Sequence, residues 1–182
     1  MATNELSGCL IVTGMPGAGK STVTQLVAEL LPRSVRLDGD ELRTMIVNGG
    51  VWALGEPADE AKRQTILCNR NLCTLAANYT DANFTTVIDH VVPDRQQWDF
   101  IASLLAPRPV MFVVLAPGLQ VCQQRNAARD PRQRVDYDYS PLDIEMRREL
   151  ADLGWWFDTS ALTPDQTADQ ILREASRRAK VN

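Results

Sequence analysis

The stretch that decides the fold reads Gly14-Met15-Pro16-Gly17-Ala18-Gly19-Lys20-Ser21. It has the Walker A form G-x-x-x-x-G-K-[ST] and stands between an apolar run, Cys9–Val12, and a strongly helical pattern. Glycines let the backbone turn tightly and approach a ligand without a Cβ in the way. The loop amides and the positive end of the following helix dipole then face one hollow, which suits phosphate oxygens. We therefore expect a nucleoside triphosphate to bind here.

The candidate nucleotide-binding residues are this stretch and Thr22 directly after it. Lys20 would reach the β- and γ-phosphates as a flexible point charge, and the Ser21 hydroxyl would ligate Mg²⁺. The expected cofactors are therefore ATP and Mg²⁺. The alternative is a glycine-rich strand–helix turn that binds nothing, and the strand before and helix after the motif make such a chance match rare.

Bulk composition indicates one domain that spans residues 1–182. The chain is 45% hydrophobic and 23% charged. A chain of this length buries enough surface to form a core without disulfide bonds or structural metals. Its net charge of −4 repels a nucleic-acid backbone, so a DNA or RNA partner would need a local basic patch. We therefore expect a small molecule rather than a nucleic acid as partner. Oligomeric state is left open.

The cysteines and the apolar runs indicate a cytoplasmic protein. The four cysteines show no C-x-x-C pairing and are expected to be reduced thiols, with Cys9 and Cys122 in the core. No apolar run approaches the ~18 residues that a membrane span needs. Met1–Ser7 lacks a signal-peptide pattern.

Hydrophobic periodicity predicts alternating strands and helices. Apolar or β-branched strands are expected at the positions 9–12, 34–37, 84–88, 110–115 and 155–157. Helices are expected after the Walker loop, from 42 to about 48–50, from about 59 to 78, after 94, from about 118, over about 141–153, and after a capping box at 163–166. The alternation predicts an α/β fold with a doubly wound, mostly parallel five-stranded sheet flanked by helices.

Three aspartates are expected at the ligand-binding edge of this sheet. Ligands of doubly wound sheets lie beyond the carboxyl ends of the strands, and Asp38, Asp40 and Asp89 follow two of these strands. Phosphoryl transfer to an alcohol needs Mg²⁺ ligands and a carboxylate that deprotonates the hydroxyl. Asp38 and Asp89 are candidate metal ligands together with Ser21. One of Asp38 and Asp40 is also expected to cap the short helix, and Asp89 could be a simple strand-end turn residue.

Gly14–Ser21 followed by Leu37-Asp38-Gly39-Asp40-Glu41-Leu42-Arg43 resembles the P-loop small-molecule kinases. The most similar groups are adenylylsulfate kinase, phage-type polynucleotide kinase and chloramphenicol phosphotransferase. The resemblance implies a P-loop NTPase fold like that of nucleoside monophosphate kinases. It also implies that Asp40, twenty residues after Lys20, accepts the substrate hydroxyl proton and that Arg43 contacts phosphate or substrate. The acid at position 89 is more similar to the antibiotic phosphotransferase group than to adenylylsulfate kinase.

The polar segment 129–140 is expected to form a mobile lid over the triphosphate. Arg125 and Arg129 are one turn apart and would share a helix face, from which they could bind nucleotide; Arg129 could also stabilise the transferring charge. The alternative for each is a solvated surface residue. His90 is expected to be a hydrogen-bonded core residue. Trp52 and Tyr79 could stack on an acceptor, with core packing as the alternative.

The function expected from these features is ATP-dependent transfer of the γ-phosphate to a hydroxyl of a small molecule, possibly an antibiotic or other natural product. The catalytic candidates are Asp40, Lys20, Arg43 and Arg129. One alternative is a polynucleotide or RNA 5′-hydroxyl kinase, which would need a basic channel that leads to Asp40. Another is a nucleotide-binding regulatory module without transfer activity.

Overall fold

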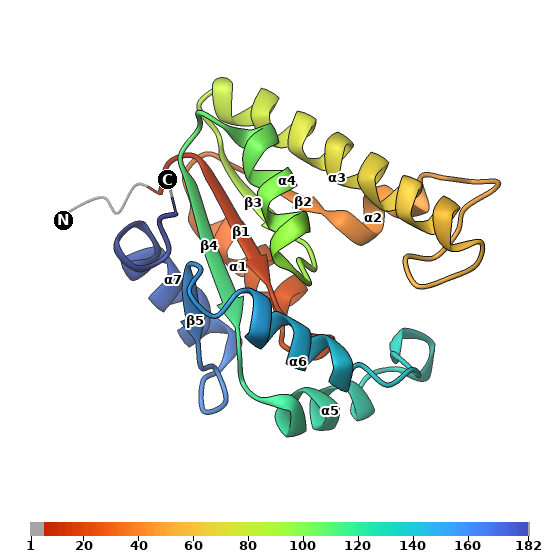
Figure 1. Cartoon of the computed structure of the whole chain (residues 1–182). Helices are drawn as coiled ribbons and strands as arrows, with labels where there is room; N and C mark the ends of the chain where they lie inside the picture. Colours follow the sequence, from red (N-terminus) through yellow and green to blue (C-terminus); the bar gives the residue numbers. More distant parts are fainter. Residues whose placement is uncertain (1–5, 182) are drawn as a thin grey trace.

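The computed structural model describes residues 6–181 (Figure 1). Most of Met1–Ser7, on which the absence of a signal peptide was argued, lies outside these residues. The strands are β1 (Cys9–Thr13), β2 (Ser34–Asp38), β3 (Thr85–Asp89), β4 (Val110–Leu115) and β5 (Trp155–Phe157). The helices are α1 (Lys20–Leu30), α2 (Gly39–Thr44), α3 (Ala58–Asp81), α4 (Arg95–Leu105), α5 (Leu119–Ala127), α6 (Ser140–Glu149) and α7 (Pro164–Arg178), with one 3-10 turn, η1 (Pro131–Gln133).

The five strands form one sheet in the order β2-β3-β1-β4-β5, and every pair is parallel. This confirms the predicted doubly wound α/β fold. Because strand order reverses beside β1, the loops after β1 and β3 leave in opposite directions and open a crevice at the carboxyl edge. The register sets Asp38 beside Asp89 and Asp89 beside Val12, so the predicted acids lie at this edge.

Helices cover both faces of the sheet (Figure 1). Helices α1 and α7 pack against each other on one face, and α3 and α4 pack against each other on the other. The middle strands β1, β3 and β4 are buried along their whole length, which explains their continuous apolar runs. Leu10, Ile88 and Phe112 are among the largest fully buried side chains. This layered core holds the carboxyl edge of the sheet rigid beneath the site.

Two helices end earlier than the sequence pattern predicted. Helix α2 ends at Thr44 rather than near 48–50, because Met45 and Val47 have no core to enter and are 69% and 87% exposed. Helix α6 ends at Glu149 rather than about 153. There the chain turns so that Leu150 can pack in the core, and its carbonyl accepts a hydrogen bond from Trp156 Nε1 at 2.8 Å.

Other local predictions are confirmed. The capping box of α7 forms, with Thr163 and Gln166 bonded to each other's backbone amides. Cys9, Cys68, Cys73 and Cys122 are buried free thiols. Among residues 6–181, no helix is both long enough and apolar enough to cross a membrane.

Candidate active site

The Walker loop has the wrapped conformation that its glycines predict. Gly17 has a φ of 83°, and a Cβ at this position would lie 2.3 Å from the carbonyl oxygen of Cys122. Only glycine fits both this left-handed backbone and the close approach of α5. The Lys20 ammonium donates hydrogen bonds to the carbonyls of Gly14 at 2.9 Å and Met15 at 3.2 Å. The lysine therefore spans the mouth of its own loop, where triphosphate oxygens would be held.

Burial lowers the pKa of Lys20, while the negative charges of Asp89 and Asp40 oppose this shift. The carboxylates of both candidate acids thus act electrostatically on the lysine that would bind the phosphates. The strand register sets Asp89 beside Val12, just before the Walker loop, and Gly39 at the start of α2 packs on His90, so these three elements lie together. The structure brings together Lys20, Asp40 and Asp89 as the sequence predicted.

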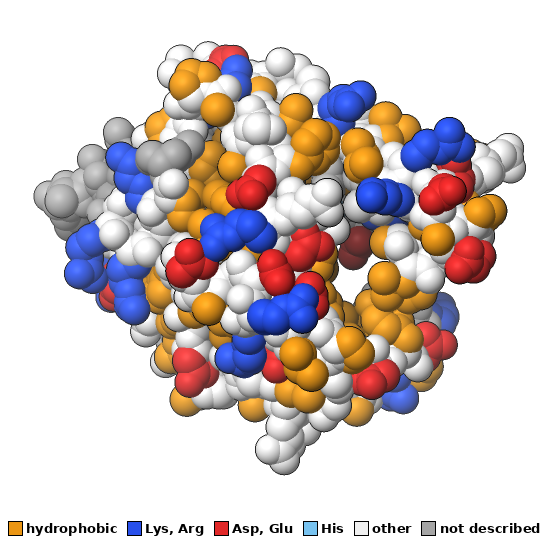
Figure 2. All heavy atoms as spheres, viewed as in Figure 1, with side chains coloured by type: hydrophobic (Ala, Val, Ile, Leu, Met, Phe, Trp, Pro, Cys, Tyr) orange, Lys and Arg blue, Asp and Glu red, His pale blue; other side chains and the backbone are white. Residues whose placement is uncertain are grey.

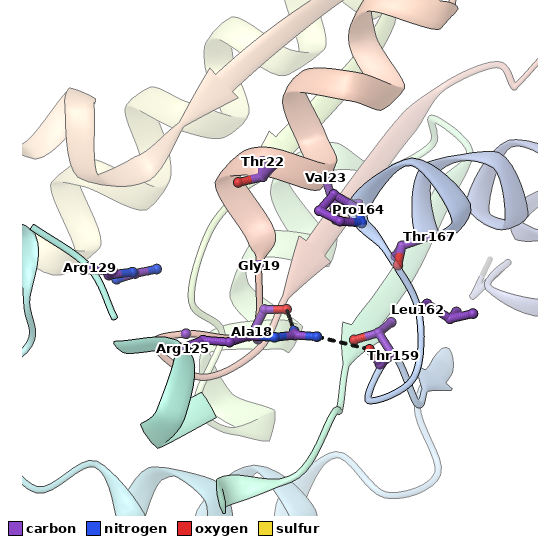
Figure 3. Close-up of a pocket in the computed structure, with 11 residues that line it drawn as sticks. Ala18, Gly19, Thr22, Val23, Arg125, Arg129, Thr159, Leu162, Pro164 and Thr167 are labelled. Carbon is purple, nitrogen blue, oxygen red and sulfur yellow. Dashed lines mark hydrogen bonds between the residues drawn. The ribbon is translucent and has the colours of Figure 1, made fainter. Parts of the chain in front are cut away.

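A pocket of about 230 Å³ lies beside the Walker loop (Figure 3). Its lining residues are Gly17, Ala18, Gly19, Thr22, Val23, Arg125, Arg129, Thr159, Leu162, Pro164 and Thr167. The Arg125 guanidinium lies between the loop and the segment after β5, and donates to the carbonyls of Ala18 at 3.3 Å and Thr159 at 3.1 Å. Thr159 belongs to the segment after β5, so the pocket lies at the carboxyl end of the strands, next to the phosphate hollow, where ligands of such sheets bind.

Arg129 lies beyond the end of the helix in which the sequence pattern predicted it. Helix α5 ends at Ala127, so Arg129 follows the helix and does not share a helical face with Arg125. The apparent one-turn spacing fails because the chain leaves the helix before Asp130-Pro131, where proline could not continue it. Arg129 nevertheless lines the same pocket, half-buried, at a point apart from Arg125 (Figure 3).

Asp89 ends β3 as a buried carboxylate, with a side chain that is 5% exposed. Burial raises the pKa of Asp89, and the charge of Lys20 and a hydrogen bond from the Ser21 hydroxyl oppose this. Ser21, in the first turn of α1, is therefore in contact with Asp89 at the end of β3. A hydroxyl and a carboxylate paired beside a phosphate hollow are oxygen ligands of the kind that Mg²⁺ takes together with phosphates and water.

Asp38 has another task in this structure. Its Oδ1 accepts hydrogen bonds from the amides of Asp40 at 2.9 Å and Glu41 at 3.3 Å, so Asp38 is the N-cap of α2. Its Oδ2 lies 2.6 Å from Arg36 Nη2. Both carboxylate oxygens are engaged, but Oδ2 makes only one of these bonds and keeps a lone pair, so Asp38 stays a candidate Mg²⁺ ligand beside Asp89. The prediction that one acid of the pair caps the helix is confirmed.

Arg36 is a site residue that the sequence analysis missed. It extends from the middle of β2 and holds two acids at once, with Nη2 2.6 Å from Asp38 and 3.1 Å from Asp89. Its Nε also donates to the Thr24 hydroxyl of α1 at 3.0 Å. The available signal was a charged residue within an otherwise strand-like run, Ser34–Leu37, which needs a partner if it points inward.

Asp40 is exposed in the first turn of α2, directly after the Asp38 cap. Gly39 before it is buried against His90, and a Cβ on Gly39 would lie 2.1 Å from His90 Nδ1. The glycine lets α2 begin this close to β3, and so it brings Asp40 to the sheet edge. An exposed carboxylate above the phosphate hollow is free to accept a proton from an incoming hydroxyl.

Arg43 lies one turn further along α2 and faces α3. Its Nη2 is 3.5 Å from the Thr65 hydroxyl, and its Nη1 is buried without a hydrogen-bond partner among the described residues. An unpaired buried guanidinium nitrogen is costly, so this nitrogen is available to a ligand. The position is compatible with the substrate or phosphate contact that the resemblance implied.

His90 is the hydrogen-bonded core residue that the sequence predicted. Its Nε2 is 2.8 Å from Asn69 Oδ1, and Asn69 Nδ2 donates to Gln97 Oε1 at 3.3 Å. Burial and the nearby cations Arg43 and Lys20 lower its pKa to about 4, against the partial compensation of Asp38. A neutral imidazole therefore joins α3 and α4 to the start of α2.

A second, larger pocket of about 540 Å³ lies on the other side of α2 from the nucleotide pocket. Its lining residues are Ala53, Leu54, Gly55, Glu56, Ala58, Ala61, Lys62, Thr65, Ile66, Asn69, Asp94, Gln96, Gln97 and Phe100. They come from the loop before α3, the amino-terminal half of α3 and the first turns of α4. Figure 2 shows this face of the molecule hollowed between that region and the segment below it. We call it the acceptor pocket.

The predicted lid, 129–140, contacts the loop that borders the acceptor pocket. The rings of Trp52 and Tyr137 lie edge to face with centroids 4.9 Å apart, and Tyr137 also meets Tyr139 at 6.3 Å. Burial, and then the charge of Asp40, raise the pKa of Tyr137, which sets this ring within electrostatic reach of Asp40. Tyr79, the other stacking candidate, instead packs on Phe84 at the far end of α3.

No group of three or more His, Cys, Asp or Glu side chains that could hold a metal ion occurs in the described part of the chain. A single acid with one hydroxyl is nevertheless the protein share that Mg²⁺ takes when substrate phosphates and waters complete its octahedron. Ser21 and Asp89 supply that share. The residues at the site therefore fit Mg²⁺ bound together with a triphosphate.

Comparisons with known proteins agree with this geometry. A family model described as an AAA domain matches residues 10–149. Shikimate kinase of Saccharopolyspora erythraea is 27% identical over 184 residues, which cover 94% of this chain and 95% of that protein. Adenylyl-sulfate kinase of Acaryochloris marina is 26% identical over 126 residues, 67% of this chain and 58% of that protein. The solved tunicamycin resistance protein of Deinococcus radiodurans shares the fold, with a TM-score of 0.69, 16% identity and coverage of 97% and 99%.

Proposed function

The chain belongs to the AAA domain family that it matches over residues 10–149, and we propose that it is an ATP-dependent kinase that phosphorylates a hydroxyl of a small molecule. One observation carries the proposal. The Walker lysine and an exposed aspartate from the start of α2 meet at one sheet edge, where the charge of Asp40 acts on Lys20. A triphosphate in the loop would present its γ-phosphate to an alcohol held by that aspartate.

The nucleotide would be positioned by backbone amides and by three cationic side chains. Loop amides and the amino end of α1 would hold the β- and γ-phosphates, while Lys20 would exchange its carbonyl partners for phosphate oxygens. The nucleoside would occupy the pocket between the loop and Thr159. Arg125 would keep that pocket in shape through its two carbonyl contacts, and Arg129 would face the transferring charge.

Mg²⁺ would be held by Ser21 and Asp89, and it would supply charge neutralisation between the β- and γ-phosphates. Arg36 fixes the carboxylate of Asp89 from behind at 3.1 Å. This contact orients the acid, and together with the charge of Lys20 and the Ser21 hydrogen bond it opposes the rise in the pKa of Asp89 that burial causes.

Asp40 would accept the proton of the acceptor hydroxyl as its oxygen attacks the γ-phosphorus in line with the departing ADP oxygen. Lys20, Arg43 and Arg129 would stabilise the negative charge that spreads over the phosphoryl oxygens. Catalysis then rests chiefly on positioning and electrostatics, since phosphoryl transfer requires little covalent chemistry from the protein.

The acceptor is a small molecule in this proposal. Relatives of this chain are named for shikimate and adenylyl sulfate, and a protein of the same fold is named for tunicamycin resistance. An antibiotic or other natural product that bears a hydroxyl is the acceptor class we favour. A 5′-hydroxyl of a nucleic acid is a poorer fit, because the acceptor pocket has Lys62 as its one cationic lining residue and Glu56 and Asp94 as acids.

A transfer assay tests the proposal. The protein is incubated with Mg²⁺ and ATP labelled at the γ-phosphate, together with hydroxylated metabolites, antibiotics or a 5′-hydroxyl oligonucleotide. We expect label to appear in a small-molecule phosphate ester and none in the oligonucleotide. Tight ATP binding without transfer to any alcohol would favour a nucleotide-binding regulatory module instead. Labelling of the oligonucleotide alone would favour a polynucleotide kinase.

A further inference from the structure

The chemistry of the acceptor pocket narrows the acceptor class. Six of its lining residues present hydrocarbon, namely Ala53, Leu54, Ala58, Ala61, Ile66 and Phe100. Its volume of about 540 Å³ is within the range of roughly 300–1,000 Å³ that accommodates drug-sized ligands. A small polyhydroxylated molecule in such a pocket would leave many of its hydroxyl groups without a hydrogen-bond partner.

The polar residues of the wall are mostly engaged by the protein itself. Glu56 accepts the amide hydrogen of Ala58 at 2.9 Å, and Asp94 accepts that of Gln97 at 2.8 Å. The Thr65 hydroxyl donates to the carbonyl of Ala61 at 2.9 Å. These bonds cap and brace α3 and α4 and hold one oxygen of each side chain, which leaves the wall fewer acceptors for an occupant than its composition suggests.

Asn69 is held at both ends of its amide, which bridges His90 and Gln97. Among the residues that the structure describes, only Lys62 and Gln96 of the charged and amide side chains in the wall make no hydrogen bond or ion pair. A polyol would need many partners, because each buried hydroxyl without one costs free energy. The wall therefore favours an occupant with a large apolar surface and few polar groups.

Aromatic side chains extend this apolar wall toward the base. Trp52 is half-exposed directly before Ala53 and Leu54 of the pocket, and its ring meets Tyr137 of the lid at 4.9 Å. Tyr137 in turn lies within electrostatic reach of Asp40. Flat aromatic faces that border a cleft favour contact with a ring.

The pocket is connected to Asp40 by two further contacts. Thr65 of the wall is 3.5 Å from Arg43 of α2, and Asn69 of the wall holds His90, on which Gly39 packs. Both contacts fix the wall relative to the helix that bears the base. An occupant that extends past Thr65 would therefore approach the helix that bears Asp40.

We propose that the acceptor is a predominantly apolar, ring-bearing alcohol whose ring system fills the acceptor pocket and contacts Trp52 and Tyr137, with its hydroxyl directed toward Asp40. The inference rests on the proposed kinase function and specifies its substrate class. It excludes small polyhydroxylated acids and open-chain sugars as preferred acceptors.

Two exposed residues of α3 form a matched pair of test variants. Ile66 lines the pocket and is 38% exposed, whereas Leu67 beside it is 47% exposed and lies outside the pocket. Ile66→Asp and Leu67→Asp replace similar hydrocarbon with the same charge on the same helix. Because both side chains are already partly in solvent, both variants are expected to fold, which circular dichroism and ATP binding would verify.

The assay compares acceptors of matched hydroxyl chemistry: secondary alcohols that carry one, two or three fused hydrocarbon rings, and polyhydroxylated six-carbon acids. We expect kcat/KM to rise with ring number and to exceed that for the polyhydroxylated acids. Ile66→Asp should lower kcat/KM for the best ring alcohol at least ~10-fold (~1.4 kcal/mol) and leave the KM for ATP unchanged. Leu67→Asp should behave as the unmodified protein does.

A preference for polyhydroxylated acids, or equal effects of the two variants on the best acceptor, would overturn the inference and leave the kinase function standing. Titration calorimetry with the same ring alcohols separates the two proposals. Binding that Ile66→Asp weakens and Leu67→Asp does not, without phosphate transfer to any alcohol, would support the pocket assignment and contradict the kinase function. Absence of binding to every ring alcohol would overturn the inference.

Discussion

At the nucleotide end of the site, a backbone loop forms the phosphate hollow, whereas side chains from several elements form the acceptor pocket. The Walker loop encloses the phosphate hollow with its own amides, and Arg125 ties the neighbouring pocket together through two main-chain carbonyls. The acceptor end instead consists of side chains from a loop, α3, α4 and the lid. The loop amides can bind the phosphates of any nucleoside triphosphate. The side chains of the acceptor pocket, in contrast, decide which alcohol fits. The contrast teaches that one end determines the reaction and the other determines the substrate.

The largest expected effect is a loss of phosphate transfer that leaves ATP binding intact. Asp40→Asn should lower kcat by roughly 10²–10⁴, the usual contribution of a general base, and leave the Kd for ATP nearly unchanged. Lys20→Ala should weaken ATP binding and transfer together. Rapid-quench measurement of phosphate transfer, with calorimetry of ATP binding, checks both. The matched control is Asp59→Asn, which removes an exposed carboxylate from the first turn of another helix, α3. Near-normal turnover of Asp40→Asn would assign the base to another acid.

A second prediction concerns the pH dependence of the free energy of unfolding that the buried His90 causes. The pKa of His90 is about 4 in the folded protein against 6.5 for the free side chain, so the unfolded chain binds the proton more readily. Stability should therefore be full above pH 6.5, fall as the pH drops toward 4, and lose about 3 kcal/mol, at ~1.4 kcal/mol per pH unit.

Chemical denaturation at successive pH values, in the presence of EDTA, measures this loss. His90 is the only histidine in the chain, so His90→Gln removes all imidazole titration. The variant should flatten the pH dependence between 4 and 6.5. An unchanged slope in His90→Gln would mean that carboxyl groups, and not this imidazole, cause the loss.

A third prediction tests how closely α2 must approach β3. Gly39→Ala inserts a Cβ 2.1 Å from His90 Nδ1, so α2 or His90 must move. We expect a loss of ~1–3 kcal/mol of stability and about tenfold in kcat, because Asp40 moves with the helix. Gly50→Ala is the control, since its nearest contact to a new Cβ is an ordinary 3.5 Å. If Gly39→Ala retains full activity, the packing on His90 does not position the base.

The smallest predicted effect lies at the nucleotide end. Arg125→Ala should raise the KM for ATP about tenfold, ~1.4 kcal/mol, because it removes the link between Ala18 and Thr159. The KM for the acceptor should not change. Arg132→Ala, which removes an 89% exposed arginine of the lid, serves as the control and should be silent in steady-state kinetics. A shift in acceptor KM for Arg125→Ala would contradict the division of the cleft into two ends.

The nucleotide end could be predicted from sequence because its information is local. The motif at 14–21, the strand before it and the helix after it are contiguous, so spacing alone defines the loop. Asp89 could be placed because the carboxyl ends of parallel strands share one edge. Arg36 was missed because its two partners come from different strand ends, one of them 53 residues away.

The acceptor end depends on long-range packing that periodicity does not contain. No sequence pattern indicates that Trp52 meets Tyr137, or that Gly39 packs on His90. Helix ends were also less predictable than helix centres. Whether α2 continued to Met45 depended on an apolar partner for that side chain, and whether α5 continued to Arg129 depended on the turn before Asp130-Pro131.

A crystal structure with Mg²⁺ and a nonhydrolysable ATP analogue tests the central claim most directly. We expect the γ-phosphate in the Walker loop, with Lys20 moved from the Gly14 and Met15 carbonyls onto it and the metal on Ser21 and Asp89. The Asp40 carboxylate should face the γ-phosphorus across a gap of roughly 6 Å, enough for one hydroxyl. A triphosphate bound elsewhere, or an Asp40 turned away beyond the reach of a bridging hydroxyl, would contradict the account.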